Sequence, residues 1–268
     1  MSISREDYEE AACPFCKPQS KASIPVARVI EKLDAYLYKK DFSAAEAHLE
    51  YWRAEAEALG DMRGLLTVLN ETVGFYRRQG EGEKSLSFAE KATLLALSQG
   101  FAETTAAGTT LLNAATAYEA FGNSEKAVEL YRQAEIIYEN RLEKTDERLG
   151  GLYNNLALAL MSTGESEEAK RYFEKALDIM AQIENREPEQ AITYCNLADL
   201  VYSEKGEGGS AEIGDYMKKA EDMLNGCKLR DGNYAYLCEK CAPVFEYYGN
   251  TEFGTELKER AKKFYDGN

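Results

Sequence analysis

The sequence has few of the residues that interrupt helices or perform catalysis. It contains five prolines in 268 residues, and none lies between Pro25 and Pro188. Because proline breaks the interior of a helix, this long stretch can form uninterrupted helices. The single histidine, His48, lies in a degenerate region, and we expect it to be exposed. No strand pattern precedes a glycine-rich loop, so the sequence predicts a protein that is not an enzyme and needs no cofactor.

Basic charge and long apolar runs are also scarce. The net charge is −15, whereas nucleic acids and anionic membranes bind basic surfaces. No segment approaches the roughly 18 apolar residues that span a membrane, and the acidic first ten residues do not resemble a secretory signal. We therefore expect a cytoplasmic protein without a nucleic-acid or membrane partner, whose six cysteines stay reduced. The acidity itself favours either solubility or the steering of a basic partner.

The sequence does contain an internal repeat. Gly80, Gly122 and Gly164 lie 42 residues apart, and each follows one predicted helix and precedes another. The two clearest copies align Leu111, Ala114, Ala115 and Tyr118 with Tyr153, Leu156, Ala157 and Leu160, and then Ala127, Tyr131 and Ala134 with Ala169, Phe173 and Ala176. Apolar residues at these spacings share one helical face. The period predicts an all-α, right-handed superhelical solenoid of about six antiparallel helix pairs.

The repeat also predicts the organisation of the chain. Residues 1–23 are expected to form an N-terminal tail or cap, because Pro14 and Pro18 block a regular helix there. The solenoid is expected to cover residues 24–268. Its repeats are expected at residues 24–59, 60–100, 101–142, 143–184, 185–228 and 229–268. In the fifth repeat, Gly206–Gly209 lengthens the turn and predicts a mobile loop.

The repeated pattern resembles the tetratricopeptide repeat, in which W-x2-L-G-x2-Y is followed by A-x3-F. The resemblance extends from Ile24 to Phe264 and is strongest in the third and fourth copies. The 42-residue period and the segment from Glu143 to Asn155 are similar to kinesin-light-chain-like repeats. The chain as a whole resembles free-standing bacterial repeat proteins. This resemblance implies a protein-interaction scaffold.

Asparagines recur near one position of the predicted first helices. Asn113, Asn155 and Asn196 lie two residues after the first apolar position of their helix, and Asn70 and Asn154 lie one residue after it. Two residues correspond to about 200° of rotation around a helix from the core-facing position. We therefore expect these amides to point away from the core and into a concave groove lined by the first helices. Asparagine is a poor helix former, which favours a specific role.

An amide ladder of this kind suits an extended peptide. Neighbouring helices lie roughly 8–10 Å apart and an extended chain advances about 3.3 Å per residue, so successive amides of the ladder would contact every third peptide unit. The family resemblance implies the same use, because kinesin-light-chain-like and peptide-receptor repeats bind peptide backbone with asparagines at this position. The alternative is that the amides bridge adjacent helices, and the two roles can coexist. Other side chains expected on this surface are Thr67, Gly74, Arg77, Thr109, Thr116, Glu119, Leu158, Asp199 and Tyr236.

Two CxxC pairs raise the possibility of a metal site. Cys13 and Cys16 with Cys238 and Cys241 formally supply the four thiolates of a structural zinc site. However, Cys238 and Cys241 occupy core positions of the last repeat, and the two pairs lie at opposite ends of the solenoid. We therefore predict no metal site, and only Cys13 with Cys16, or a head-to-tail pairing of two chains, remains as an alternative.

These observations favour a scaffold or adaptor that binds an extended peptide or a partner helix in its groove. A second hypothesis is a peptide-sensing signalling receptor, although the first 23 residues are too few for the DNA-binding or effector helices that such receptors carry. A third is a self-assembling structural scaffold, so a homo-oligomer remains possible. The sequence does not identify the partner.

Overall fold

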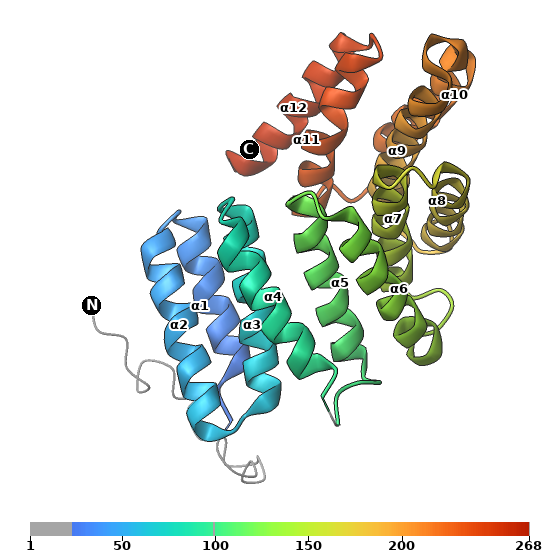
Figure 1. Cartoon of the computed structure of the whole chain (residues 1–268). Coiled ribbons are helices and arrows are strands. Elements are labelled where there is room, and N and C mark those ends of the chain that lie inside the picture. The colour runs from blue at the N-terminus through green and yellow to red at the C-terminus, as the bar shows by residue number, and fades with distance from the viewer. Residues whose placement is uncertain (1–22, 99, 268) are drawn as a thin grey trace. The chain divides into compact units, whose positions relative to one another are not determined.

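A computed structural model describes residues 23–98 and 100–267, and this part of the chain forms twelve α-helices and one short 3₁₀ helix, with no strand (Figure 1). The all-α fold predicted from the repeat is confirmed. Cys13 and Cys16 lie outside the described residues. The chain divides into two compact units, the first ending at Ile137 and the second beginning at Tyr138.

The helices follow one another as six pairs. The first helices of the pairs are α1 (Val26–Tyr38), α3 (Met62–Arg78), α5 (Thr105–Ala120), α7 (Glu147–Ser162), α9 (Glu187–Lys205) and α11 (Gly232–Tyr247). The second helices are α2 (Phe42–Leu59), α4 (Gly82–Ala96), α6 (Ser124–Arg141), α8 (Ser166–Met180), α10 (Ser210–Gly226) and α12 (Thr251–Tyr265). In the first unit, α2 also packs against α3 and α4 against α5, and in the second unit α8 packs against α9.

The periodic glycines terminate first helices. Gly80, Gly122 and Gly164 have φ angles of 74°, 78° and 86°, a left-handed conformation that glycine adopts without a steric penalty. In each case the next residue donates its N–H to a carbonyl in the last turn, namely that of Tyr76, Tyr118 or Leu160. This hydrogen bond defines the Schellman motif. In the first pair, Lys40 takes the same position with a φ of 56°.

The core of the first unit includes a residue that we expected at the surface. His48 is fully buried, and its Nε2–H donates to the carbonyl of Val29 at 2.8 Å. The rings of Tyr36 and Trp52 pack against it at centroid distances of 5.7 and 6.5 Å. The expectation of an exposed histidine is wrong, because His48 lies three residues after the core residue Ala45 and four before Trp52. It therefore shares their helical face.

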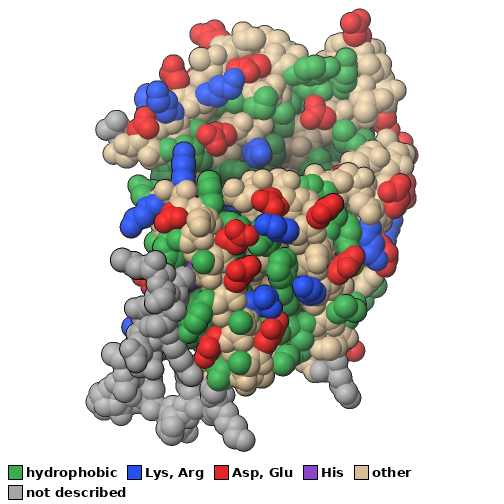
Figure 2. All heavy atoms as spheres, turned by 60° about the vertical axis from the view of Figure 1, so that its left-hand side comes forward, with side chains coloured by type: hydrophobic (Ala, Val, Ile, Leu, Met, Phe, Trp, Pro, Cys, Tyr) green, Lys and Arg blue, Asp and Glu red, His purple; other side chains and the backbone are tan. Residues whose placement is uncertain are grey.

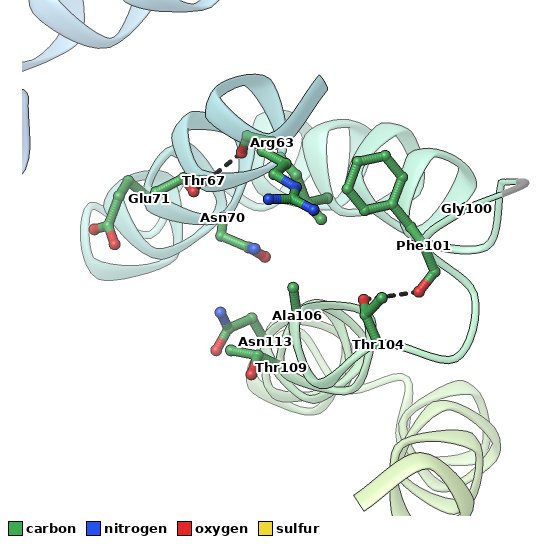
Figure 3. Close-up of a pocket in the computed structure, with 11 residues that line it drawn as sticks. Arg63, Thr67, Asn70, Glu71, Gly100, Phe101, Thr104, Ala106, Thr109 and Asn113 are labelled. Carbon is green, nitrogen blue, oxygen red and sulfur yellow. Dashed lines mark hydrogen bonds between the residues drawn. The ribbon is translucent and has the colours of Figure 1, made fainter. Parts of the chain in front are cut away.

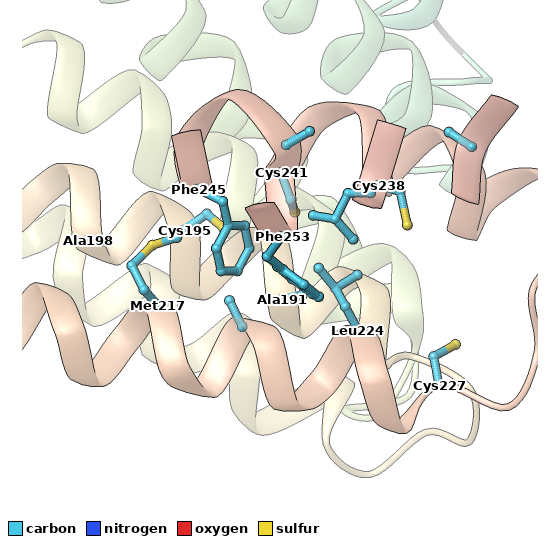
Figure 4. Packing of buried hydrophobic residues seen from close by; sticks show 14 of the residues in the cluster. Ala191, Cys195, Ala198, Met217, Leu224, Cys227, Cys238, Cys241, Phe245 and Phe253 are labelled. Carbon is cyan, nitrogen blue, oxygen red and sulfur yellow. The ribbon is translucent and has the colours of Figure 1, made fainter. Parts of the chain in front are cut away.

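The core of the second unit contains four cysteines. Cys195, Cys227, Cys238 and Cys241 are all buried in one cluster with Phe245 and Leu257 (Figure 4). Cys238 and Cys241 have no exposed surface, which confirms their predicted core positions. Burial raises the pKa of Cys238 to about 11, so the thiol stays protonated and packs as a small apolar group.

Three further features of the described residues bear on function. Gly206–Gly209, where the sequence predicted a mobile loop, forms a 3₁₀ helix between α9 and α10, with Gly209 buried. No helix of the described ranges is both long enough and apolar enough to cross a membrane. On the face shown in Figure 2, acidic and basic side chains lie interspersed rather than in a patch of one sign.

Candidate functional site

In the first unit, α3 and α5 pack side by side and border a cavity of about 540 Å³ (Figure 3). Its lining consists of Arg63, Leu66, Thr67, Asn70 and Glu71 from α3, Ala106, Thr109 and Asn113 from α5, and Gly100, Phe101 and Thr104 from the segment between α4 and α5. The α3 residues recur at intervals of three, four, seven and eight, and the α5 residues at three and seven. These intervals place each set on one helical face. The opposite face of α3 supplies core residues such as Leu65 and Leu69.

Asn70 is the most constrained polar residue of the cavity. Its Nδ2 donates to Thr110 Oγ1 at 2.9 Å, and the Thr110 hydroxyl in turn donates to the carbonyl of Ala106 at 2.9 Å. Its Oδ1 is buried and has no hydrogen-bond partner within residues 23–98 and 100–267. A buried acceptor without a partner costs about 1–3 kcal/mol. The amide points from α3 toward α5, so this free acceptor is available to a donor that enters between the helices (Figure 3).

Asn113 faces the same cavity from α5. Its side chain is half-buried and forms no hydrogen bond with any residue that the structure describes. Thr67 and Thr109 also line the cavity, and each donates its hydroxyl to a carbonyl of the preceding turn. The structure thus brings Asn70, Asn113, Thr67 and Thr109 together, all four of which the sequence placed on the groove surface.

Two further candidates of the first unit lie outside this cavity. The Thr116 hydroxyl donates to the carbonyl of Leu112 and lies 3.0 Å from the Tyr131 hydroxyl. Arg77 lies in the last turn of α3 and is half-buried. Neither residue contributes to the cavity wall.

In the second unit, two of the predicted asparagines bond to each other. Asn154 Oδ1 accepts from Asn196 Nδ2 and from Thr193 Oγ1, both at 3.1 Å. Asn196 is only 8% exposed, so its amide is part of the packing between α7 and α9. Asn155 is half-buried, and its side chain makes no hydrogen bond within the described ranges. Asn154 and Asn196 therefore bridge two helices, as the structural alternative predicted.

Asp199 on α9 is tied to the last helix pair. Its carboxylate accepts a hydrogen bond from the Tyr248 hydroxyl at 2.8 Å. Burial raises the pKa of Asp199 above its usual value, and the hydrogen bond from Tyr248 opposes only part of this rise. The pKa of Tyr248 is also raised, first by burial and then by its hydrogen bond to the Asp199 carboxylate.

Sequence reasoning missed Arg63, Glu71 and Phe101. Arg63 and Glu71 lie four residues before and after Thr67, which we had placed on the groove surface, so helical spacing could have found both. Phe101 comes from an irregular segment, where no periodicity exists to indicate its direction. In the described part of the chain, neither Arg63 nor Glu71 forms an ion pair or a side-chain hydrogen bond.

Metal binding finds no support in the part of the chain that the structure describes. Nowhere in it do three or more His, Cys, Asp or Glu side chains form a group that could hold a metal ion. The thiol of Cys241 contacts that of Cys195, and burial and this contact both raise the pKa of Cys241. A raised thiol pKa disfavours the thiolate that metals require.

Comparison with known proteins agrees with this architecture. Solved structures of similar fold include the apo form of RapI, with a TM-score of 0.64 and 17% identity over 93% of this chain and 88% of that chain. NprR in complex with its cognate peptide NprX has a TM-score of 0.57 and 18% identity over 88% of this chain and 66% of that one. The TPR-like repeats attributed to a kinesin light chain of Podosopora anserina have a TM-score of 0.54 and 19% identity over 74% and 94%.

Sequence comparison identifies the family. No curated protein sequence matches the chain. The family model of the tetratricopeptide repeat matches residues 65–140 and 148–213, which together make up more than half of the sequence. The chain belongs to the tetratricopeptide repeat family.

Proposed function

We propose that this protein is an interaction scaffold that binds an extended peptide segment in the cavity between α3 and α5. The observation that carries the proposal is the buried Oδ1 of Asn70, which has no hydrogen-bond partner among the residues that the structure describes. Asn113 on the facing helix adds a second amide, and neither its oxygen nor its nitrogen forms a hydrogen bond in the described ranges. Each amide offers both donor and acceptor groups, and an extended peptide presents unpaired backbone N–H and C=O groups to match them.

Size and architecture support the same function. A volume of about 540 Å³ lies within the range of roughly 300–1,000 Å³ that is usual for ligand pockets. The tetratricopeptide fold fits a protein-interaction scaffold, and NprR, which has a similar fold, was solved with a bound peptide. In the second unit, Asn155 is the amide that remains for a ligand, because Asn154 and Asn196 bond to each other.

The proposal is tested by selecting peptides from a displayed random heptapeptide library on the full chain. A selected peptide is then labelled with a fluorophore and titrated by fluorescence anisotropy. We expect Asn113→Ala to weaken binding about three- to tenfold, which is the loss of one neutral hydrogen bond. The melting temperature is expected to stay the same, because Asn113 makes no internal hydrogen bond with a described residue.

A matched control removes an amide elsewhere. Gln182→Ala deletes an exposed amide at the end of the fourth helix pair and is expected to leave the affinity unchanged. The proposal is wrong if no peptide is enriched over an unrelated protein, or if Asn113→Ala binds the selected peptides as tightly as the wild type does.

A further inference from the structure

We propose that the same cavity selects peptides by charge order, with an anionic group of the peptide bound by Arg63 and a cationic group bound by Glu71. The peptide backbone between the two charges would lie against Asn70 and Asn113. This inference rests on the proposed function and specifies the class of ligand: a short segment that carries one acidic and one basic group.

Arg63 is an exposed cation, and its guanidinium borders the cavity (Figure 3). It forms no ion pair with any described residue, so the charge is available to a ligand. A guanidinium group presents a planar fork of donors that matches a carboxylate with two parallel hydrogen bonds.

Glu71 provides the opposite charge on the other side of Asn70 (Figure 3). Its side chain is half-buried. The pKa of Glu71 is raised, mainly by burial; the charge of Arg78 opposes part of this rise, and the charge of Asp34 adds to it. A partly desolvated carboxylate without an ion pair is stabilised by any cation that approaches it. A lysine, an arginine or a terminal amine of the ligand would supply that cation.

The spacing of the two charges sets the length of the segment between them. Arg63 and Glu71 are eight residues apart on one helix, which corresponds to about 12 Å along its axis. An extended peptide advances about 3.3 Å per residue, so its two charges should lie about three to four residues apart. Phe101, which is half-buried and also borders the cavity, offers apolar surface to a peptide side chain between the two charges.

The test uses an array of labelled peptides that each contain one Asp and one Lys in an Ala/Leu/Gly background. The separation of the charges varies from one to six residues, and both orders are included. Acetylated, amidated peptides report on side-chain charges alone, and a second set with free termini shows whether a terminal carboxylate or amine serves instead. We expect the tightest binding at a separation of three or four residues, in one of the two orders only.

Variants then assign the charges. Arg63→Gln is expected to lower the affinity for the preferred peptide about tenfold or more, which is the usual effect of losing a charge-assisted hydrogen bond. Glu71→Gln is expected to remove the preference for Lys. The double exchange Arg63→Glu with Glu71→Arg is expected to reverse the preferred order. Arg171→Gln, which makes the same charge change as Arg63→Gln on the exposed face of α8, is the matched control and is expected to have no effect.

The outcomes separate this inference from the proposed function. One outcome is that peptides bind with an affinity that Asn113→Ala lowers but that depends neither on the charge order nor on the Arg63 and Glu71 variants. In that case the charge inference is wrong and the proposal of peptide binding stands. If the wild type binds no peptide of the array and none from the random library, both are wrong. Should one charge variant fail to fold, the other and the order preference of the wild type still decide.

Discussion

The α3/α5 pair of the first unit and the α7/α9 pair of the second carry nearly the same polar residues and use them differently. Both later helices contain a Thr-x-x-Asn sequence, at Thr110 and Asn113 and at Thr193 and Asn196. In the second unit, Asn154 accepts hydrogen bonds from both members of this sequence. In the first, Asn70 donates to Thr110, its oxygen meets no donor in the described part of the chain, and Asn113 borders a cavity.

A difference of one residue accompanies this contrast. Asn196 follows Asn154 by 42 residues, whereas Asn113 follows Asn70 by 43. Asn70 and Asn154 nevertheless both bond to the threonine of the next Thr-x-x-Asn sequence. The pairs differ in the second asparagine, because Asn196 reaches Asn154 whereas Asn113 borders the cavity. An asparagine on a first helix therefore either braces two helices or remains available to a ligand.

The largest expected effect comes from removing an asparagine that braces two helices. Asn154→Ala takes the acceptor from the buried amide of Asn196 and from Thr193, so we expect a loss of about 1–3 kcal/mol in the free energy of unfolding. Asn113→Ala should stay within about 0.5 kcal/mol of the wild type, because alanine favours the helix and no internal hydrogen bond with a described residue is lost. Urea unfolding followed by circular dichroism measures both. Equal losses in the two variants would contradict the distinction between the pairs.

An intermediate effect is expected from the glycines that terminate helices, and it should be the same in both units. Gly122→Ala in the first unit and Gly164→Ala in the second each place a side chain at a positive φ, at a cost of about 1–2 kcal/mol. A Cβ at either position would meet no atom within 4 Å, so backbone strain alone acts. Lys40→Gly is the reverse change and should raise the melting temperature. A clear difference between Gly122→Ala and Gly164→Ala would show that the units differ in backbone as well as in side chains.

The smallest expected effect is a pH dependence of stability that arises from His48, the only histidine of the chain, in the first unit. Burial lowers the pKa of His48, so the unfolded chain, with a pKa near about 6.5, binds a proton before the folded one does. The stability that this residue contributes is therefore complete above about pH 6.5 and decreases as the pH falls toward the pKa of the folded state. His48→Gln keeps a donor for the Val29 carbonyl and cannot titrate, so its melting temperature should fall less between pH 7.5 and 5.5. Parallel profiles of variant and wild type would refute this assignment.

Most of the fold could be predicted from the sequence because the decisive residues act locally. The glycine at position 122 ends a helix through its own φ angle, and the small residue Ala127 marks a close helix contact through its own size. His48 was misjudged because its exposure was inferred from the weak repeat around it rather than from its spacing to Ala45 and Trp52.

The site was harder to predict because it depends on pairs of helices. Helical spacing placed Asn70, Asn113, Asn154 and Asn196 on one surface, but it does not give the register between two helices, and that register decides which amide meets another. The cavity also requires Phe101, which comes from a segment without periodicity. The roles proposed for Arg77, Thr116, Asn155 and Asp199 in ligand binding remain predictions.

The distribution of two residue types gives each unit its own intrinsic probe. The only tryptophan, Trp52, is buried in the first unit, and the four cysteines of the described chain are buried together in the second. A thiol reagent reacts with such cysteines only when the surrounding helices open. In a variant that carries Cys13→Ser and Cys16→Ser, fluorescence emission and the rate of thiol modification would therefore follow the opening of the two units separately in a single unlabelled sample.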